Sequence, residues 1–193
     1  MQKEIFEQPL IIGDSLSRFL DPIKKKINIL DLKVNWKQIS KIDFIACGTS
    51  YFACQTATYW FEKYLNLNAN SYLASEFRYK TYVKSKNTLS IFVSQSGETA
   101  DTLAALKFAK KNDSKIFSIV NNSESSIARE SHNFITIEAG PEIGVASTKA
   151  FTAQLSVLAC LCLIAGRERK TINSSNEQKL TEKLLEIPSN MSS

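Results

Sequence analysis

The stretch Leu89–Leu103, "LSIFVSQSGETADTL", decides how the rest of the sequence is interpreted. Its apolar run ends at Val93, six residues rich in hydroxyl and amide groups follow, and a helical pattern begins near Ala100. An apolar run without alternation is typical of a strand that is covered on both faces, as in a parallel sheet. The stretch therefore predicts a buried strand, a polar tip and a helix, in that order.

The same plan recurs along the chain. Further apolar runs with polar tips begin at Ile42, Lys115 and Asn133, and a weaker strand candidate begins at Ala69. Between them, Tyr51–Leu65 and Ala100–Lys111 place apolar residues along one helical stripe. Strands that alternate with helices predict an α/β domain with a parallel sheet.

The two ends of the chain have a different pattern. Residues 1–41 predict a lead-in of short helices that are interrupted by Pro9, Gly13 and Pro22. Residues 171–193 predict a polar linker and one short amphipathic helix, Lys179–Ile187, which Pro188 stops. The core domain is expected between them, over residues 42–170.

The composition is that of one folded domain. At 193 residues, with 44% hydrophobic and 22% charged side chains, two full domains would be cramped. The net charge of +5 favours a solvated basic face over nucleic-acid binding, because aromatic residues are not interleaved with the basic ones. The basic clusters are Lys24–Lys26, Lys84 with Lys86, Lys107 with Lys110 and Lys111, and Arg167–Lys170.

The cysteines and the ends of the sequence predict a cytoplasmic protein. Cys47, Cys54, Cys160 and Cys162 lack C-x-x-C spacing, so we expect small buried side chains in a reducing compartment and no metal site. The N-terminus lacks the order of a signal peptide. The apolar run Leu155–Ala165 is far shorter than the roughly 20 residues of a membrane span, which predicts a buried helix and no membrane partner.

The polar tips predict a phosphate site. In an open parallel sheet, ligands bind beyond the carboxyl ends of the strands, where loops lead into helix N-termini. Backbone N–H groups and the helix dipole favour an anion there, and hydroxyls add further donors. Glycines let the backbone approach the anion closely. The residues in question are Ser94, Gln95, Ser96 and Thr99 around Gly97, and Thr49 with Ser50 after Gly48.

A simpler alternative is helix capping, since Ser and Thr are preferred N-caps and a single tip is usually just that. Two such tips favour a binding site. Neither G-x-x-x-x-G-K-[ST] nor G-x-G-x-x-G occurs, which disfavours a nucleoside triphosphate or a dinucleotide, and no cofactor is expected. A small phosphorylated molecule, held by uncharged donors, fits the pattern.

Four motifs, "ACGTSYFA", "ASEFRYK", "SQSGETADTLAAL" and "EIGVASTKAFTAQL", closely resemble the isomerase part of the glucosamine-6-phosphate synthases, the glutamine:fructose-6-phosphate aminotransferases of amino-sugar biosynthesis. The resemblance runs from Met1 to about Gly166. It implies the first of two SIS (sugar isomerase) domains, a flavodoxin-like three-layer αβα sandwich with a mainly parallel five-stranded sheet. It also implies a homodimer that forms through the isomerase module.

The resemblance implies binding residues for fructose 6-phosphate or glucosamine 6-phosphate. Those for the phosphate are Ser50, Ser94, Gln95, Ser96 and Thr99; those in the neighbouring loop are Cys47, Gly48 and Thr49; those for the sugar chain are Val145 and Ser147. Taken without the family, Ser147 is the expected N-cap of the buried helix that starts at Thr148.

The resemblance implies no catalytic residue in this chain, because the Glu, Lys and His of the family lie in the second SIS domain and the C-terminal tail. We interpret Glu98 as a first-turn helix carboxylate, Glu142 as a loop carboxylate and His132 as structural. Gln2, not the nucleophilic cysteine of the family's glutaminase domain, follows Met1. We therefore expect the fragment alone to be inactive.

Two other functions remain open from the sequence. A sugar-phosphate-sensing SIS module of a transcriptional regulator would need a helix-turn-helix near the N-terminus, where residues 1–41 offer proline-broken pieces. A structural dimerisation module would need self-association of the isolated piece.

Overall fold

The computed structural model describes residues 1–21, 23–29, 32–81, 87–112 and 114–192. In the core, strands and helices alternate: β3 (Lys41–Ala46), α2 (Gly48–Leu65), β4 (Asn68–Leu73), α3 (Ala74–Phe77), β5 (Thr88–Ser94), α4 (Ala100–Lys111), β6 (Lys115–Val120), α5 (Ser126–Glu130), β7 (Asn133–Thr136) and α6 (Lys149–Arg169). Flanking them are α1 (Gln2–Phe19), β1 (Leu20–Asp21), β2 (Lys26–Ile27), the short 3-10 helix η1 (Trp36–Gln38) and α7 (Ser174–Ser192). The five predicted strands are confirmed as β3 to β7.

The five strands form one parallel sheet in the order β4-β3-β5-β6-β7. Strands β3 and β5 are neighbours although α2, β4 and α3 lie between them in sequence. Ala46 pairs with Val93, and Ser94 pairs with Val120, so the strands end side by side. Their polar tips therefore lie next to each other at the C-terminal ends of the strands.

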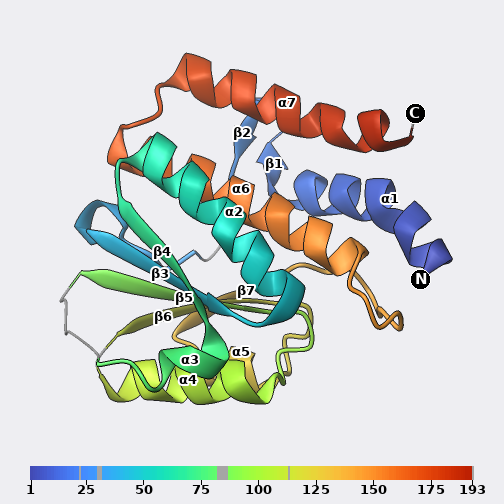
Figure 1. The fold of residues 1–193 in the computed structure, drawn as a ribbon. Coiled ribbons are helices and arrows are strands. Elements are labelled where there is room, and N and C mark those ends of the chain that lie inside the picture. The colour runs from blue at the N-terminus through green and yellow to red at the C-terminus, as the bar shows by residue number, and fades with distance from the viewer. Residues whose placement is uncertain (22, 30–31, 82–86, 113, 193) are drawn as a thin grey trace.

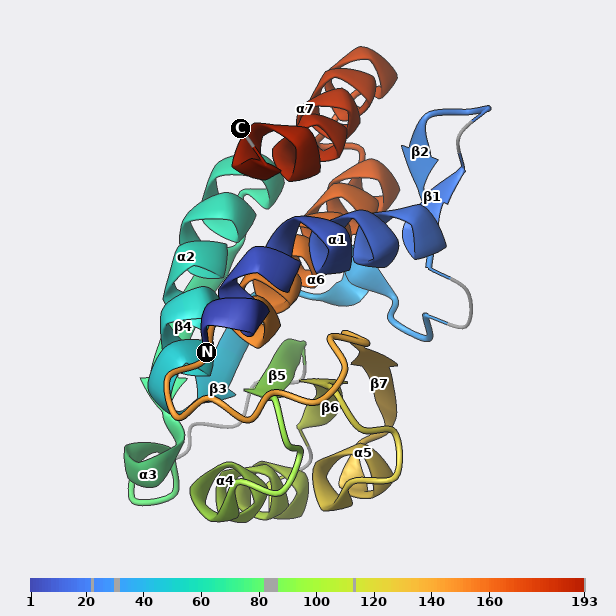
Figure 2. The same cartoon turned by 90° about the vertical axis from the view of Figure 1, so that its right-hand side faces the viewer.

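Helices cover both faces of this sheet (Figure 1). The large core on the α2 and α6 side includes Ile91 and Val93, while the smaller core on the α4 and α5 side includes Phe92. Successive side chains of β5 thus enter opposite cores, which explains its continuous apolar run. The predicted αβα sandwich is confirmed, and Figure 2 shows α1 and α7 as further helices outside α2 and α6.

The expectation of short N-terminal helices was wrong, because α1 runs unbroken past Pro9 and Gly13. Pro9 has no N–H to donate to the carbonyl of Ile5, one turn earlier. The side chain of Gln8 replaces that donor, with its Nε2 3.0 Å from the oxygen of Ile5. Pro22 lies outside the described residues.

The short C-terminal helix was also mispredicted, because α7 begins at Ser174 and continues through Pro188. Leu180, Leu184 and Ile187 pack against the large core, and this packing supports the helix along its length. A Cβ on Gly13 would lie 3.8 Å from the ring of Pro188, so α1 and α7 approach closely at these two residues. The division of the chain at residues 41 and 170 stays a prediction.

Helix α6 is the central helix of the fold. It is long and apolar enough to cross a membrane, yet 78% of that stretch is buried inside the protein. Packing against α1 and α2 accounts for its apolar composition. The prediction of a buried helix here is confirmed.

Candidate functional site

The loop between β5 and α4 is held by its own hydroxyl groups. Ser94 is buried, and its Oγ accepts the N–H of Gly97 at 3.1 Å and lies 2.9 Å from Oγ1 of Thr99. The Oγ of the exposed Ser96 accepts the N–H of Glu98 at 3.1 Å. The turn is therefore built before any ligand is bound, with Ser and Thr side chains along it.

Gly97 is required by the backbone of this turn. Its φ of +67° lies in the left-handed region that side chains disfavour. A Cβ there would also lie 2.1 Å from Oγ of Ser125, at the N-terminus of α5. The N–H of Ile127 donates to the carbonyl of Gly97 at 3.0 Å, so the turn packs directly onto α5.

The tip after β3 has a related geometry. Gly48 has a φ of +57°, and its position is open, since no described atom lies within 4 Å of a Cβ built there. Ser50 is buried, and its Oγ accepts a hydrogen bond from Nε2 of Gln154 at 2.9 Å. Thr102 of α4 donates to Sγ of Cys47 at 3.8 Å, which brings the β3 and β5 tips into contact.

The two helices that follow the β3 and β5 tips, α2 and α4, begin with backbone N–H groups that no described side chain caps. Within the described part of the chain, no side chain caps α2, whose N-cap is Cys47, or α4, whose N-cap is Thr99. Uncapped N–H groups need an acceptor, and together with the helix dipole they favour an anion. The simpler alternative, that Thr49 and Ser50 cap the helix, does not apply, because both lie inside α2, which begins at Gly48.

The residues expected at the sugar chain lie in the sugar loop, the segment 139–148 between β7 and α6. Val145 is fully exposed, and the half-buried Ser147 donates to Oε2 of Glu142 at 2.9 Å. The other oxygen of Glu142 accepts the N–H groups of Thr148 and Ala150 at 2.8 and 3.3 Å. Glu142, not Ser147, thus satisfies the first turn of α6, whose N-cap is Thr148.

Asn121, at the tip of β6, joins the sugar loop to the β5 tip. Its backbone N–H donates to the carbonyl of Gln95 at 3.1 Å. Its side chain accepts from Ala139 and donates to Gly140, both at 2.8 Å. Sequence reasoning missed Asn121, although its place in a polar strand tip, "IVNNSES", was a usable signal.

Glu98 and His132 both accept hydrogen bonds from backbone N–H groups. Glu98 precedes α4 by two residues, so it is not in the first turn as expected. It accepts the N–H of Ser126 at 2.7 Å, and hydrogen bonds from the backbone and side chain of Ser126 lower its pKa. His132 is exposed and accepts the N–H of Ile116 through Nδ1 at 3.0 Å, at the start of β6 and away from the strand tips, which agrees with a structural or solvated histidine.

The four cysteines all lie in described segments and are free thiols. Cys54, Cys160 and Cys162 are buried as predicted, whereas Cys47 is half-buried. Burial raises the pKa of Cys54 far above its ordinary value and raises the pKa of Cys160 and Cys162 to about 12. Thiols of this kind stay protonated and behave as small apolar groups.

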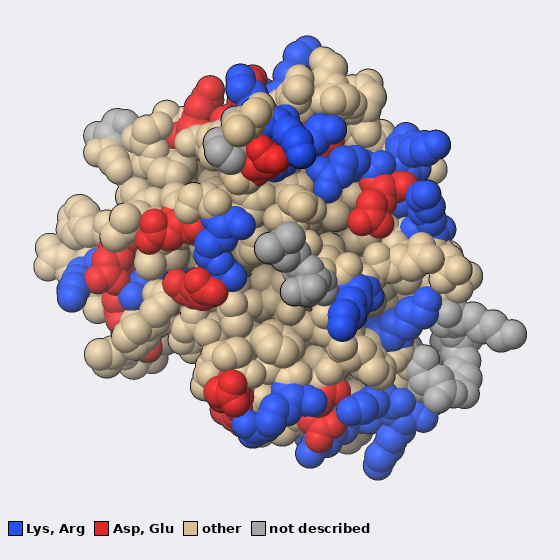
Figure 3. Space-filling model, turned by 180° about the vertical axis from the view of Figure 1, so that it is seen from behind, with Lys and Arg blue, Asp and Glu red and all other residues tan. Residues whose placement is uncertain are grey.

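The basic residues are mixed with acidic ones. On the face shown in Figure 3, Lys and Arg side chains alternate with Asp and Glu and do not form one continuous stripe. Lys110 pairs with Glu130 at 2.9 Å, for example. Lys84 and Lys86 lie outside the described residues. This face supports the prediction of a solvated surface.

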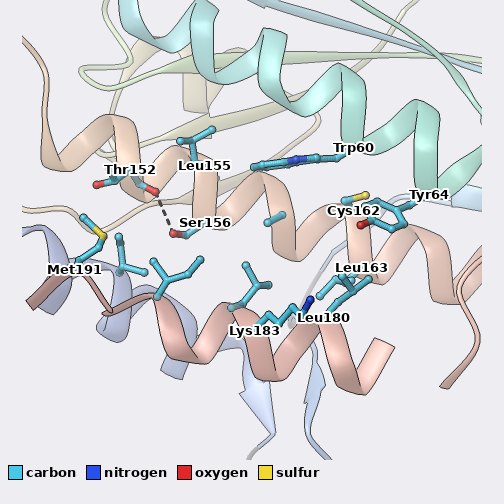
Figure 4. A pocket seen from close by; sticks show the side chains of 14 residues that line it. Trp60, Tyr64, Thr152, Leu155, Ser156, Cys162, Leu163, Leu180, Lys183 and Met191 are labelled. Carbon is cyan, nitrogen blue, oxygen red and sulfur yellow. Dashed lines mark hydrogen bonds between the residues drawn. The ribbon is translucent and has the colours of Figure 1, made fainter. Parts of the chain in front are cut away.

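A separate cavity of about 440 Å³ lies between α2, α6 and α7 (Figure 4). Its wall is mostly apolar, with Trp60, Tyr64 and Leu155 on one side and Leu180 on the other. Ser156, one of its few polar groups, donates to the carbonyl of Thr152 in its own helix. The cavity therefore offers volume and few oriented donors.

Comparison with known proteins agrees with this architecture. The sequence pattern of the SIS domain family matches residues 36–164. An isomerising glutamine–fructose-6-phosphate aminotransferase from Brucella abortus is 48% identical over 188 residues, which are 97% of this chain and 31% of that protein. The Bradyrhizobium diazoefficiens enzyme of the same name is 47% identical over the whole chain and 32% of its own length.

Solved structures give the same result. The C-terminal domain of glucosamine-fructose-6-phosphate aminotransferase from Francisella tularensis superimposes with a TM-score of 0.93 and 39% identity, covering 98% of this chain and 53% of that one. A glucosamine-6-phosphate deaminase from Thermotoga maritima, at 22% identity and a TM-score of 0.74, shares the fold over 97% of this chain and 53% of its own. The chain spans about a third of the length of the curated relatives it matches. With more than half of its residues matched by the family pattern, this chain belongs to the SIS domain family.

Proposed function

We propose that this chain binds the phosphate and sugar chain of fructose 6-phosphate or glucosamine 6-phosphate, as the first SIS half of the isomerase module of a glucosamine-6-phosphate synthase in amino-sugar biosynthesis. One observation carries the proposal. Helices α2 and α4, which follow the adjacent strands β3 and β5 on opposite faces of the sheet, begin with uncapped N–H groups beside the Ser and Thr side chains of the two strand tips. The identity to aminotransferases of this kind supports the choice of ligand.

The proposed contacts divide into two sets. Ser50, Ser94, Gln95, Ser96 and Thr99 would hold the phosphate, with Cys47, Gly48 and Thr49 beside it; Val145 and Ser147 would contact the sugar chain. Charge-assisted hydrogen bonds from neutral donors to a phosphate are about twice as strong as neutral ones. A site without a lysine can therefore still select a dianion.

In this proposal the chain binds but does not move the proton between adjacent carbons of the sugar. That step needs a positioned base. The carboxylates of Glu98 and Glu142 accept hydrogen bonds from backbone N–H groups at the starts of α5 and α6. His132 lies at the opposite end of the strands, near the start of β6. The base would come from another part of a longer enzyme, and a cytoplasmic location would suit its metabolite substrate.

Titration calorimetry with fructose 6-phosphate tests the proposal. Millimolar affinity, on the order of 4 kcal/mol, is expected for a site that is half of a larger pocket. Ser96→Ala and Thr99→Val should each weaken binding about tenfold or more, because each removes a hydroxyl near a charged group. Thr58→Ala is the matched control, since Thr58 donates to the carbonyl of Gln55 in its own helix. Equal affinity in wild type and both site variants contradicts the proposal.

The proposed assembly is a homodimer that forms through the isomerase module. A larger module is suggested by the similarity to an aminotransferase C-terminal domain, at 39% identity and a TM-score of 0.93, of which this chain covers 53%. Sedimentation velocity at micromolar concentration measures it directly. A monomer over that whole range would exclude self-association by this part of the module.

A further inference from the structure

The N-terminal helix reaches the sugar loop across 139 residues of sequence. Oε1 of Glu4 accepts the N–H of Ile143 at 2.6 Å and the N–H of Gly144 at 3.1 Å. Glu4 is itself buried, with 7% of its surface exposed. Figure 2 shows the N-terminus beside the loop that leads into α6.

The fit between helix and loop is close. A Cβ on Gly144 would lie 2.5 Å from Oε2 of Glu4. Glu7 follows Glu4 by nearly one turn of α1, and its Oε2 lies 2.7 Å from Nζ of Lys149. Lys149 is 95% buried, at the start of α6. Residues three apart on a helix share a face, so α1 presents both carboxylates to the loop and the helix that follows it.

The middle of the sugar loop depends on backbone hydrogen bonds. Ile143 and Val145 project into solvent, with 90% and all of their surfaces exposed, so their side chains contribute little packing. One end of the loop is held from β6, by Asn121 at Gly140, and the other end is held within the loop, by Glu142 at Thr148. Glu4 is the described side chain that accepts the two N–H groups in between.

We propose that Glu4 is a positioning residue for the sugar chain of the bound hexose phosphate. Its carboxylate fixes the backbone at Ile143 and Gly144 and thereby sets the positions of Val145 and Ser147, without touching the ligand. This inference rests on the proposed function, because the roles of those two residues belong to it. The β5 tip has its own hydrogen bonds, through Ser94 and Ser96, and does not depend on Glu4.

The charge state of Glu4 agrees with this role. The N–H of Ile143, the ammonium group of Met1 and the N–H of Gly144 lower the pKa of Glu4 to about 2. The carboxylate is therefore ionised at neutral pH, in the form that accepts these hydrogen bonds most strongly.

The test compares two probes by calorimetry on the full chain: fructose 6-phosphate and inorganic phosphate. Glu4→Ala should weaken fructose 6-phosphate about tenfold while inorganic phosphate changes less than about twofold, since two hydrogen bonds to the sugar loop are lost and none at the β5 tip. Glu4→Gln, whose amide oxygen still accepts the two N–H groups, should recover most of the affinity. Asp14→Ala is the matched control, because Asp14 is an exposed carboxylate on the same helix.

Each outcome decides the question. Unchanged fructose 6-phosphate affinity in Glu4→Ala, or equal losses for both probes, overturns the positioning role while the proposed function stands. Wild type that binds neither probe overturns the proposed function itself. If Glu4→Ala does not fold, Gly144→Ala replaces it, because the added methyl group meets the carboxylate from the loop side. The same split between the two probes is expected, and its absence counts against the inference.

Discussion

The β5 tip and the cavity between α2, α6 and α7 differ in polarity: the cavity has an apolar wall, and the tip has hydroxyl and backbone N–H groups. The cavity has a volume of about 440 Å³ and an apolar wall that includes Trp60 and Leu155. The tip has hydroxyls, a left-handed glycine and a free helix start within Ser94–Thr99. A charged metabolite needs oriented donors more than it needs volume, so the β5 tip is the better candidate for a phosphate.

The largest effect is expected for Gly97→Ala. The substitution forces a side chain into a left-handed φ and against Ser125, which together should cost about 3 kcal/mol of folding free energy. Phosphate binding should be lost with the turn. Urea unfolding and phosphate titration measure the two effects.

Gly48→Ala is the matched control for this substitution. Its φ is equally left-handed, but its Cβ would face open space among the described residues. It should cost only about 1 kcal/mol. Equal losses at both glycines would show that the contact with Ser125 is unimportant.

A smaller effect is expected for Gln154→Leu. Gln154 donates to Ser50, which leaves the hydroxyl proton of Ser50 free to point toward a ligand. Without that donor the hydroxyl can rotate, and fructose 6-phosphate should bind about tenfold more weakly, or about 1.4 kcal/mol. Ser156→Ala, in the same helix, should leave calorimetric affinity unchanged. A loss of equal size in Ser156→Ala would assign the effect to the helix and not to Ser50.

Filling the apolar cavity should have a modest effect of the opposite sign. Ala159 lines the cavity, so Ala159→Leu should stabilise the fold by about 0.5 to 1 kcal/mol if the new side chain fits. Phosphate affinity should not change. A change in affinity would mean that the two regions are coupled, and this would break the comparison.

The smallest effect is the acid dependence of the sugar loop. The pKa of Glu4 is lowered to about 2 in the folded chain from an ordinary 4.5, so its contribution to stability is complete above pH 4.5 and is lost as the pH falls through 2. The melting temperature of wild type should therefore exceed that of Glu4→Gln above pH 4.5, and the two should converge near pH 2. A constant difference over that range would contradict the assignment.

The sheet was predictable because its signals are local. A parallel strand that is buried on both faces carries a mostly apolar run, as β5 does: all of its residues from Thr88 to Ser94 are buried, and Ile91–Val93 are apolar. The ends of the chain were mispredicted because their helices depend on contacts that a local pattern does not contain. Gln8 replaces the donor that Pro9 lacks, and Gly13 packs against Pro188 from the far end of the sequence.

The candidate site divides in the same way. The residue types at the strand tips were visible in sequence, because Ser, Thr and Gly cluster there. The partners that orient them were not, since Gln154 is 104 residues from Ser50 and Glu4 is 139 residues from Ile143. A lone glutamine in the apolar stretch of α6 was the available signal for one of these pairs.

The nearness of Met1 to Gly144 has a practical consequence for purification. A Cβ on Gly144 would lie 3.5 Å from Cα of Met1, so an affinity tag fused ahead of Met1 would emerge against the sugar loop. Such a tag would crowd the loop that is proposed to contact the sugar chain. Protein used to compare those two ligands should therefore have any amino-terminal tag removed by a protease before measurement.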